Sequence, residues 1–253
     1  MNTSPFLNSS YLSSKSCYYH IHQLCCIRSY LGLYRSNHST ETAVLKVLSD
    51  ILLALDSGKL ALLSLLDLSA AFDSFDHDTL LQRLQTSYSL GGNVIAWFAS
   101  YLTGRSVRIV TSRSISLAVL FGVPQGSVLG PILFLFYVAD LLQLVKRHGL
   151  HPHCYADDTR IYGFCDPSDV DALQERLSVC IDEVFSWMMS NQLQLSPSKT
   201  EVLWCSSARR QHQIPTGPVR VGDTSVQSVW TVPDLGVYID ADVTMSAHLV
   251  IWL

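Results

Sequence analysis

The tetrapeptide YADD at residues 155–158 lies between two short apolar segments, residues 151–155 and 159–164. Two segments of this kind, joined by a few turn residues, predict a β-hairpin, here with Ala156-Asp157-Asp158 at its tip. A carboxylate that leaves water is costly unless another group compensates its charge. Because two acids stand at the end of an otherwise apolar hairpin, this tip is the first candidate for a functional site.

A third acid follows another apolar run. Residues 60–66 are almost wholly apolar and come after Gly58, which predicts a buried strand that ends at Asp67. Should this strand lie beside the hairpin, Asp67 would converge with Asp157 and Asp158, and three ionised carboxylates repel one another. A divalent cation relieves that repulsion, and hard oxygen ligands favour Mg²⁺ over zinc. Two such ions can hold a nucleotide triphosphate and activate an attacking hydroxyl group.

Each acidic segment taken alone also has an ordinary explanation. An aspartate at the end of a strand usually caps a helix or faces water, and paired aspartates are common in turns. The catalytic interpretation therefore depends on several segments occurring together and in order. The segment between the strand and the hairpin is GVPQGS at residues 122–127, whose glycines and proline are equally compatible with a plain turn.

The rest of the pattern predicts helices and short strands. Apolar periodicity with end signals predicts helices at residues 39–56, 78–88, 93–102, 131–148 and 168–191, with Ser39 or Thr40, Asn93 and Ser168 as N-caps. Short apolar runs predict strands at residues 107–110, 115–121, 201–205, 219–221 and 235–239, and a polar loop is expected at residues 206–218. Local antiparallel pairs mixed with helices indicate an α+β layer fold.

The composition excludes several classes of protein. Of the 253 residues, 48% are hydrophobic and 15% are charged, which is incompatible with a disordered chain. The net charge is −4, so any nucleic-acid binding must use a local basic surface or a metal ion rather than overall charge. The seven cysteines form no CxxC pair, which argues against a zinc finger or a disulfide framework and favours a reducing compartment.

No membrane span and no signal peptide are expected. The stretch between Arg113 and Asp140 has no charged residue, but glycine and proline interrupt it, so a strand, a loop and a helix are the better interpretation. Nothing in the sequence specifies cytoplasm or nucleus. The crowded His148, His151, His153 and Cys154 make a zinc site conceivable, although their spacing favours ordinary structural roles. Arg209, Arg210 and His212 could contact phosphates, with solvation as the alternative.

The ordered segments resemble a known family. LLDLSAAFDSFDH at residues 65–77, GVPQGSVLGPILF at residues 122–134 and YADD resemble the palm motifs of reverse transcriptases, in particular those of non-LTR, LINE-type retrotransposons. Further matches are YRSNHSTETAVLKV at residues 34–47, LQLSPSKTEVLW at residues 193–204 and DLGVYID at residues 234–240. The ordered set is too specific to arise by chance.

The resemblance implies an α+β right-hand polymerase palm, an antiparallel sheet backed by helices, with partial fingers and without a thumb. We expect an atypical N-terminal segment at residues 1–33, the reverse transcriptase domain at residues 34–248 and a truncated end at residues 249–253. Asp67 and Asp157 would be the main ligands of two Mg²⁺ ions, or of Mn²⁺, with Asp158 as the accompanying acid.

Further roles are implied position by position. Lys199 matches a candidate proton donor to the leaving pyrophosphate, with a solvated surface lysine as the alternative. Phe72 matches an aromatic steric gate against ribonucleotides, with an ordinary core phenylalanine as the alternative. Gln125 and Gly126 match a nucleotide-binding loop. Arg35 matches a basic residue that meets the triphosphate, and Leu235 and Gly236 match a hairpin that grips the primer.

The implied reaction is attack of a primer 3′-OH on a dNTP, directed by an RNA template. The expected partners are therefore an RNA template, a DNA primer and dNTPs. Two alternatives stay open: an inactive, truncated transposon relic, and a non-catalytic module that binds nucleic acid or another protein.

Overall fold

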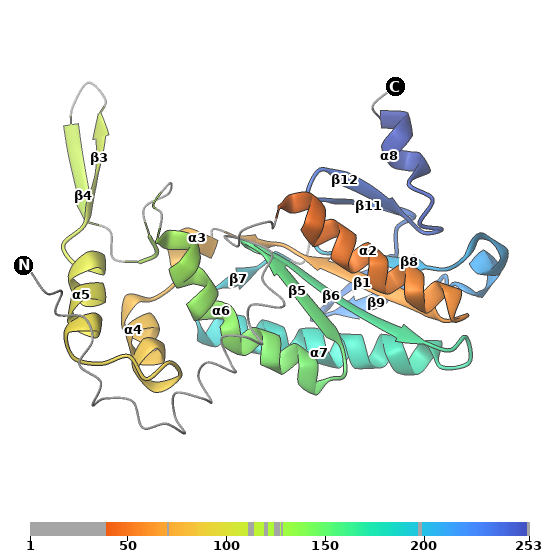
Figure 1. Ribbon diagram of the computed structural model, residues 1–253, viewed down its shortest axis with the longest axis horizontal. Helices are drawn as coiled ribbons and strands as arrows, with labels where there is room; N and C mark the ends of the chain where they lie inside the picture. Colours follow the sequence, from red (N-terminus) through yellow and green to blue (C-terminus); the bar gives the residue numbers. More distant parts are fainter. Residues whose placement is uncertain are drawn as a thin grey trace, which may run out of the picture.

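The computed structural model describes residues 39–69, 71–110, 114–118, 121–123, 127, 129–196 and 199–251. A four-stranded antiparallel sheet forms its centre, with the strand order β5-β6-β1-β8. The strands are β1 (Leu60–Leu66), β5 (His151–Tyr155), β6 (Asp158–Cys165) and β8 (Glu201–Cys205). The expected strand at residues 60–66 and the hairpin therefore do lie side by side (Figure 1).

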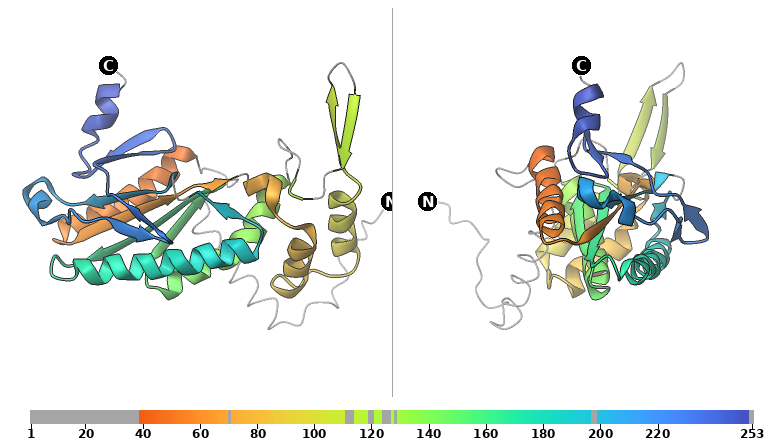
Figure 2. Two further views of the ribbon diagram at one scale, coloured as in Figure 1. Left: turned by 180° about the vertical axis from the view of Figure 1, so that it is seen from behind. Right: turned by 90° about the vertical axis from the view of Figure 1, so that its right-hand side faces the viewer.

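Helices cover both faces of this sheet. On one face lie α6 (Gly130–Arg147) and α7 (Val170–Ser190), and on the other lies α2 (Thr40–Asp56), as Figure 2 shows from the end of the molecule. The alternation along β1 explains this sandwich, since Leu60 and Leu62 join the core under α6 and α7, whereas Ala61 and Leu63 join the core under α2. The expected antiparallel sheet backed by helices is confirmed.

The start of α2 follows its local sequence. Ser39 is the N-cap and forms a reciprocal capping box with Thr42, which satisfies two of the first backbone N–H groups. The predicted helix at residues 39–56 is therefore confirmed. No helix in the described part of the chain has both the length and the apolar character that crossing a membrane requires.

Two predicted caps are wrong. Helix α5 (Asn93–Leu102) is preceded by Gly92, and no side chain caps it. Helix α7 has Asp169 rather than Ser168 as its N-cap residue, because the Ser168 hydroxyl donates to the Asp169 carboxylate instead of accepting from the helix. Residues of capping type thus occur near both helix starts, but their side chains take no part in capping.

The elements away from the sheet are smaller. A group at one end of the molecule contains α3 (Ala71–Ser74), α4 (His77–Thr86), α5 and the projecting hairpin of β3 (Ser106–Val110) and β4 (Ser114–Ala118) (Figure 1). The C-terminal part contains β9 (Val219–Val221), β10 (Thr224–Val226), β11 (Thr231–Asp234), β12 (Val237–Asp240) and α8 (Ser246–Ile251). A short pair, β2 (Leu68–Ser69) with β7 (Gln194–Leu195), continues from β1.

Two predictions for the C-terminal part need correction. Residues 235–239 do not form one strand, because Leu235 and Gly236 are the turn that joins β11 to β12. The polar loop at residues 206–218 contains a 3₁₀ helix, η2 (Ala208–Gln213). Arg210 in this helix donates to the backbone carbonyl of Gly58, so it has a structural role rather than being simply solvated.

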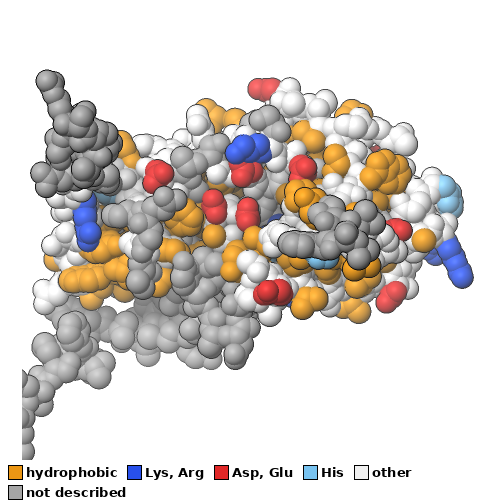
Figure 3. All heavy atoms as spheres, turned by 90° about the horizontal axis from the view of Figure 1, so that it is seen from above, with side chains coloured by type: hydrophobic (Ala, Val, Ile, Leu, Met, Phe, Trp, Pro, Cys, Tyr) orange, Lys and Arg blue, Asp and Glu red, His pale blue; other side chains and the backbone are white. Residues whose placement is uncertain are grey.

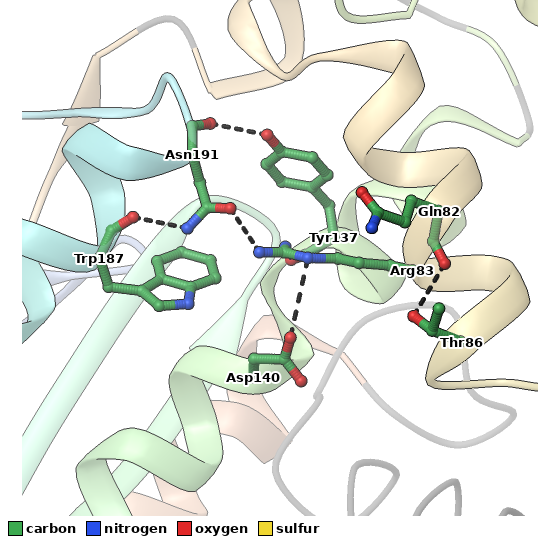
Figure 4. Close-up of polar contacts among 7 residues, drawn as sticks. All are labelled: Gln82, Arg83, Thr86, Tyr137, Asp140, Trp187 and Asn191. Atoms are coloured by element: carbon green, nitrogen blue, oxygen red, sulfur yellow. Dashed lines mark hydrogen bonds and ion pairs between the residues drawn. The ribbon is translucent and has the colours of Figure 1, made fainter.

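Arg83 joins the outlying α4 to α6 and α7 (Figure 4). Its guanidinium lies 4.7 Å from the ring centre of Tyr137 and 5.0 Å from that of Trp187. It also donates to the Asn191 side-chain oxygen at 2.5 Å and to the Tyr137 backbone carbonyl, and Asp140 lies 3.7 Å from its Nε. A planar cation between two aromatic rings, with donors on both edges, is an arrangement that only arginine provides.

Replacing Arg83 by lysine is expected to lower the free energy of unfolding by about 2 kcal/mol, because the ammonium keeps the charge but loses the fork of donors and the stacking. Urea unfolding measures this loss. The matched control is Arg147→Lys, since Arg147 is largely exposed and approaches Glu183 no closer than 4.0 Å. Equal stability of Arg83→Lys and the wild-type chain would contradict the proposed role of Arg83.

Candidate active site

The acidic hairpin ends in a tight turn. Tyr155 pairs with Asp158, so Ala156 and Asp157 alone form the turn between β5 and β6. Asp158 is thus the first residue of β6, not a turn residue as expected from the sequence. Ala156 has a φ of 55°, a left-handed conformation that costs a non-glycine residue roughly 1–2 kcal/mol. Strain of this kind is concentrated at functional sites, where the surrounding structure maintains it.

The sheet brings Asp67 to this hairpin. The last β1–β6 pair is Leu66 with Thr159, so the next step of the register places Asp67 opposite Asp158. The backbone carbonyl of Asp67 accepts a hydrogen bond from the Ser196 N–H at 3.0 Å, which fixes the chain just after β1. The predicted meeting of the strand end and the hairpin is therefore confirmed at the level of the backbone.

The pKa of the Asp158 carboxyl group responds to the residues that β1 and the hairpin bring near it. Burial of its carboxyl group raises its pKa above the usual value, while Arg160 acts in the opposite direction. Negative charges on Asp157, Asp234 and Asp67 raise the pKa further. Asp158 therefore lies within electrostatic reach of both other predicted metal ligands. Figure 3 shows acidic side chains gathered near the middle of the upper face of the molecule, beside basic ones.

Lys199 occupies part of this acidic site. Its Nζ lies 3.2 Å from an Asp67 carboxylate oxygen, and the lysine side chain is 67% exposed. An exposed ion pair of this kind contributes little to stability, so the ammonium is free to exchange partners. Lys199, predicted from sequence as a proton donor, is thus brought beside Asp67, one of the predicted metal ligands.

Among the residues that the structure describes, no three His, Cys, Asp or Glu side chains are spaced to hold a metal ion. The donor set nevertheless fits a hard divalent cation, since it consists of carboxylate oxygens whose mutual repulsion a cation relieves. A set of carboxylate oxygens alone is not typical of zinc. The histidines and Cys154 at residues 148–154 are likewise not spaced to hold a metal ion. Burial raises the pKa of the Cys154 thiol to about 11, so this residue is a neutral thiol at neutral pH.

Phe72 packs against α6. Its ring is half-buried, with its centre 4.9 Å from that of Phe134. Its backbone carbonyl accepts a hydrogen bond from the Val123 N–H at 2.9 Å. The side chain is thus supported by α6 on one side without being fully enclosed, an arrangement compatible with both the gate and the core interpretation.

Gly122 anchors the segment that carries GVPQG. Its N–H donates to the Phe75 carbonyl at 2.8 Å, and its carbonyl lies 2.6 Å from the His77 ring nitrogen. Its φ is 66°, and a Cβ added there would lie 2.2 Å from the Phe72 carbonyl oxygen. Only glycine fits this position. The predicted nucleotide-binding residues Gln125, Gly126 and Arg35 lie outside the described residues.

The predicted primer-grip residues form a tight turn of their own. Leu235 and Gly236 have φ values of 48° and 85°, which is the pattern of a hairpin turn with both central residues left-handed. Leu235 packs against the core beneath α2. The residue before the turn, Asp234, forms a buried ion pair with Arg160 on β6. Sequence reasoning missed this pair, which no local signal reveals.

Comparison with solved structures defines the class of the fold. The chain superposes on apo telomerase from Candida tropicalis with a TM-score of 0.59 and 12% identity, covering 92% of this chain and 40% of that one. Apo telomerase from the same organism, truncated from the C-terminal domain, gives a TM-score of 0.57 over 97% of this chain and 49% of that one. At this level of identity the likeness shows the fold alone, and it confirms the palm-type reverse transcriptase fold.

The sequence comparisons define the family. A model of the family "Reverse transcriptase (RNA-dependent DNA polymerase)" matches residues 17–230, and the chain belongs to this family. Its relatives include the probable RNA-directed DNA polymerase from transposon BS of Drosophila melanogaster, which is 28% identical over 225 residues, covering 85% of this chain and 24% of that protein. The RNA-directed DNA polymerase from mobile element jockey of Drosophila funebris is 27% identical over 226 residues, with the same coverage. The expected kinship with LINE-type elements is confirmed, and the chain spans about a quarter of the length of these relatives.

Proposed function

We propose that this chain carries the catalytic centre of an RNA-directed DNA polymerase, within the domain expected at residues 34–248. The observation that supports this best is the register of β1 against β6, which continues past the Leu66–Thr159 pair so that Asp67 faces Asp158, the residue next to Asp157 in the hairpin turn. A cluster of like charges is unfavourable for the fold and useful for holding cations.

Asp67, Asp157 and Asp158 would hold divalent ions, Mg²⁺ or Mn²⁺, which supply positive charge for the attacking and leaving oxygens of nucleotidyl transfer. Lys199 is placed beside Asp67, from where its ammonium would give a proton to the departing pyrophosphate. The turn of Leu235 and Gly236 would hold the primer end. The substrates would be dNTPs and a DNA primer on an RNA template.

Primer extension tests the proposal. The purified chain is incubated with an RNA template, an annealed DNA primer and dNTPs, with Mg²⁺ or with EDTA, and its fold is checked by circular dichroism. Extension that requires Mg²⁺ is the expected result. A folded chain that fails to extend the primer at any Mg²⁺ or Mn²⁺ concentration would show that its motifs record ancestry, as in a transposon relic.

Phe72→Val is expected to increase the use of ribonucleotides relative to dNTPs by roughly 10-fold to 100-fold, because the smaller side chain no longer collides with a 2′-OH. Competition between rNTPs and dNTPs in primer extension measures this ratio. The matched control is Phe185→Val, which removes the same volume from a half-buried phenylalanine on α7. If both variants leave the ratio unchanged, Phe72 is an ordinary core residue.

A further inference from the structure

Arg160 and Asp234 form an ion pair in the interior, 74 residues apart in the sequence. Each side chain is only 1% exposed. The Arg160 Nε donates to Asp234 Oδ1 at 2.5 Å, and Nη2 contacts the same oxygen. Arg160 is two residues after Asp158 on β6, and Asp234 immediately precedes the turn of Leu235 and Gly236. The pair therefore joins the strand of the acidic site to the hairpin of the proposed primer grip.

This ion pair contributes little to the stability of the fold. Both contacts converge on one carboxylate oxygen, and within the described residues Arg160 Nη1 and Asp234 Oδ2 have no hydrogen-bond partner. A buried pair with unsatisfied atoms recovers little of its desolvation cost, and two apolar side chains in its place are often as stable or more stable. Its advantage over apolar packing is direction, since an ion pair specifies one relative position of its partners.

The two partners differ in how firmly their backbones are held. Arg160 is paired on both sides, with Leu65 on β1 and with His153 on β5, so it belongs to the rigid centre of the sheet. The hairpin of β11 and β12 forms a sheet of its own. Backbone hydrogen bonds from Val229 to Val202 and from Ser206 to Ala241 hold its open end to the central sheet. Towards the turn it rests on apolar residues such as Val232 and Ile239, whose contacts are non-directional.

We propose that Arg160 and Asp234 are positioning residues that fix the turn of Leu235 and Gly236 relative to Asp157 and Asp158. This inference rests on the proposed function, because it assigns the pair the task of holding the primer end in line with the acids. Nucleotidyl transfer requires the attacking oxygen to be placed to within a fraction of an ångström, so loss of the pair costs productive primer binding.

The test uses the full chain with both partners replaced, Arg160→Met together with Asp234→Leu. The melting temperature is expected to stay at or above that of the wild-type chain. Hydrogen exchange of the β11 and β12 amides is expected to accelerate, and the KM for primer–template to rise at least tenfold while the KM for dNTP is unchanged. Arg160→Lys, which keeps the charge, is expected to restore part of the primer affinity.

The matched control removes an ion pair elsewhere, with Arg220→Gln and Asp182→Asn. These side chains pair at 2.6 Å but are 46% and 38% exposed, on β9 and α7. The control is expected to leave primer KM and hairpin exchange unchanged. A folded Arg160→Met, Asp234→Leu chain with wild-type exchange and primer KM would overturn the positioning role. Faster hairpin exchange in a chain that never extends a primer would support the anchoring and refute only the proposed function.

Discussion

Asp157→Asn is expected to lower the rate of primer extension by a factor of about 10³ or more, since it removes a negative charge that would hold the cations on which the transition state depends. The fold should be nearly unchanged. Asp157 lies in the two-residue turn of the hairpin and is only partly buried, and asparagine has the same shape and is well tolerated in turns. Single-turnover extension and thermal unfolding of the same preparation separate the two effects.

The matched control for this prediction is Asp166→Asn. Asp166 is exposed and follows β6 at the opposite end from the acidic turn, so its neutralisation should affect neither extension nor stability. Extension at the wild-type rate by Asp157→Asn would refute its role as a metal ligand. Equal losses in both variants would point to a general effect of net charge.

Gly122→Ala is expected to lower the free energy of unfolding by about 3 kcal/mol or more, because overpacking and left-handed strain act together. The new Cβ would lie 2.2 Å from the Phe72 carbonyl oxygen and 2.6 Å from the Asp73 Cα. Both are backbone atoms, so no side chain can rotate away to make room. Urea unfolding measures the loss, and the displaced Phe72 is expected to lower extension as well.

Gly149→Ala is a close control for this clash. Gly149 has a φ of 67°, one degree from that of Gly122, but nothing lies within 4 Å of an added Cβ. Its substitution should cost only the conformational strain, about 1 kcal/mol. The difference between the two variants therefore measures the steric contact alone. Equal destabilisation by the two substitutions would show that the loop moves away freely.

Local sequence signals were sufficient for many elements. The strand at residues 60–66 and the capped helix that begins after Ser39 have the predicted bounds, because an apolar run and a capping residue act over a few neighbouring positions. The two turns of the candidate site were harder to predict. Ala156 and Leu235 adopt left-handed φ values that their side chains disfavour, so propensity gives no signal for the turn residue at either position.

The sequence by itself determined the family, the order of the elements and the identity of the acids, since motifs and periodicity are local properties of the chain. The tertiary structure decided which of these residues meet. It placed Asp67 opposite the hairpin, brought Lys199 to Asp67, pressed Gly122 against the Phe72 backbone and paired Arg160 with Asp234. Such contacts join positions tens of residues apart, where the energy depends on burial and on the geometry of packing, and no spacing along the chain encodes either.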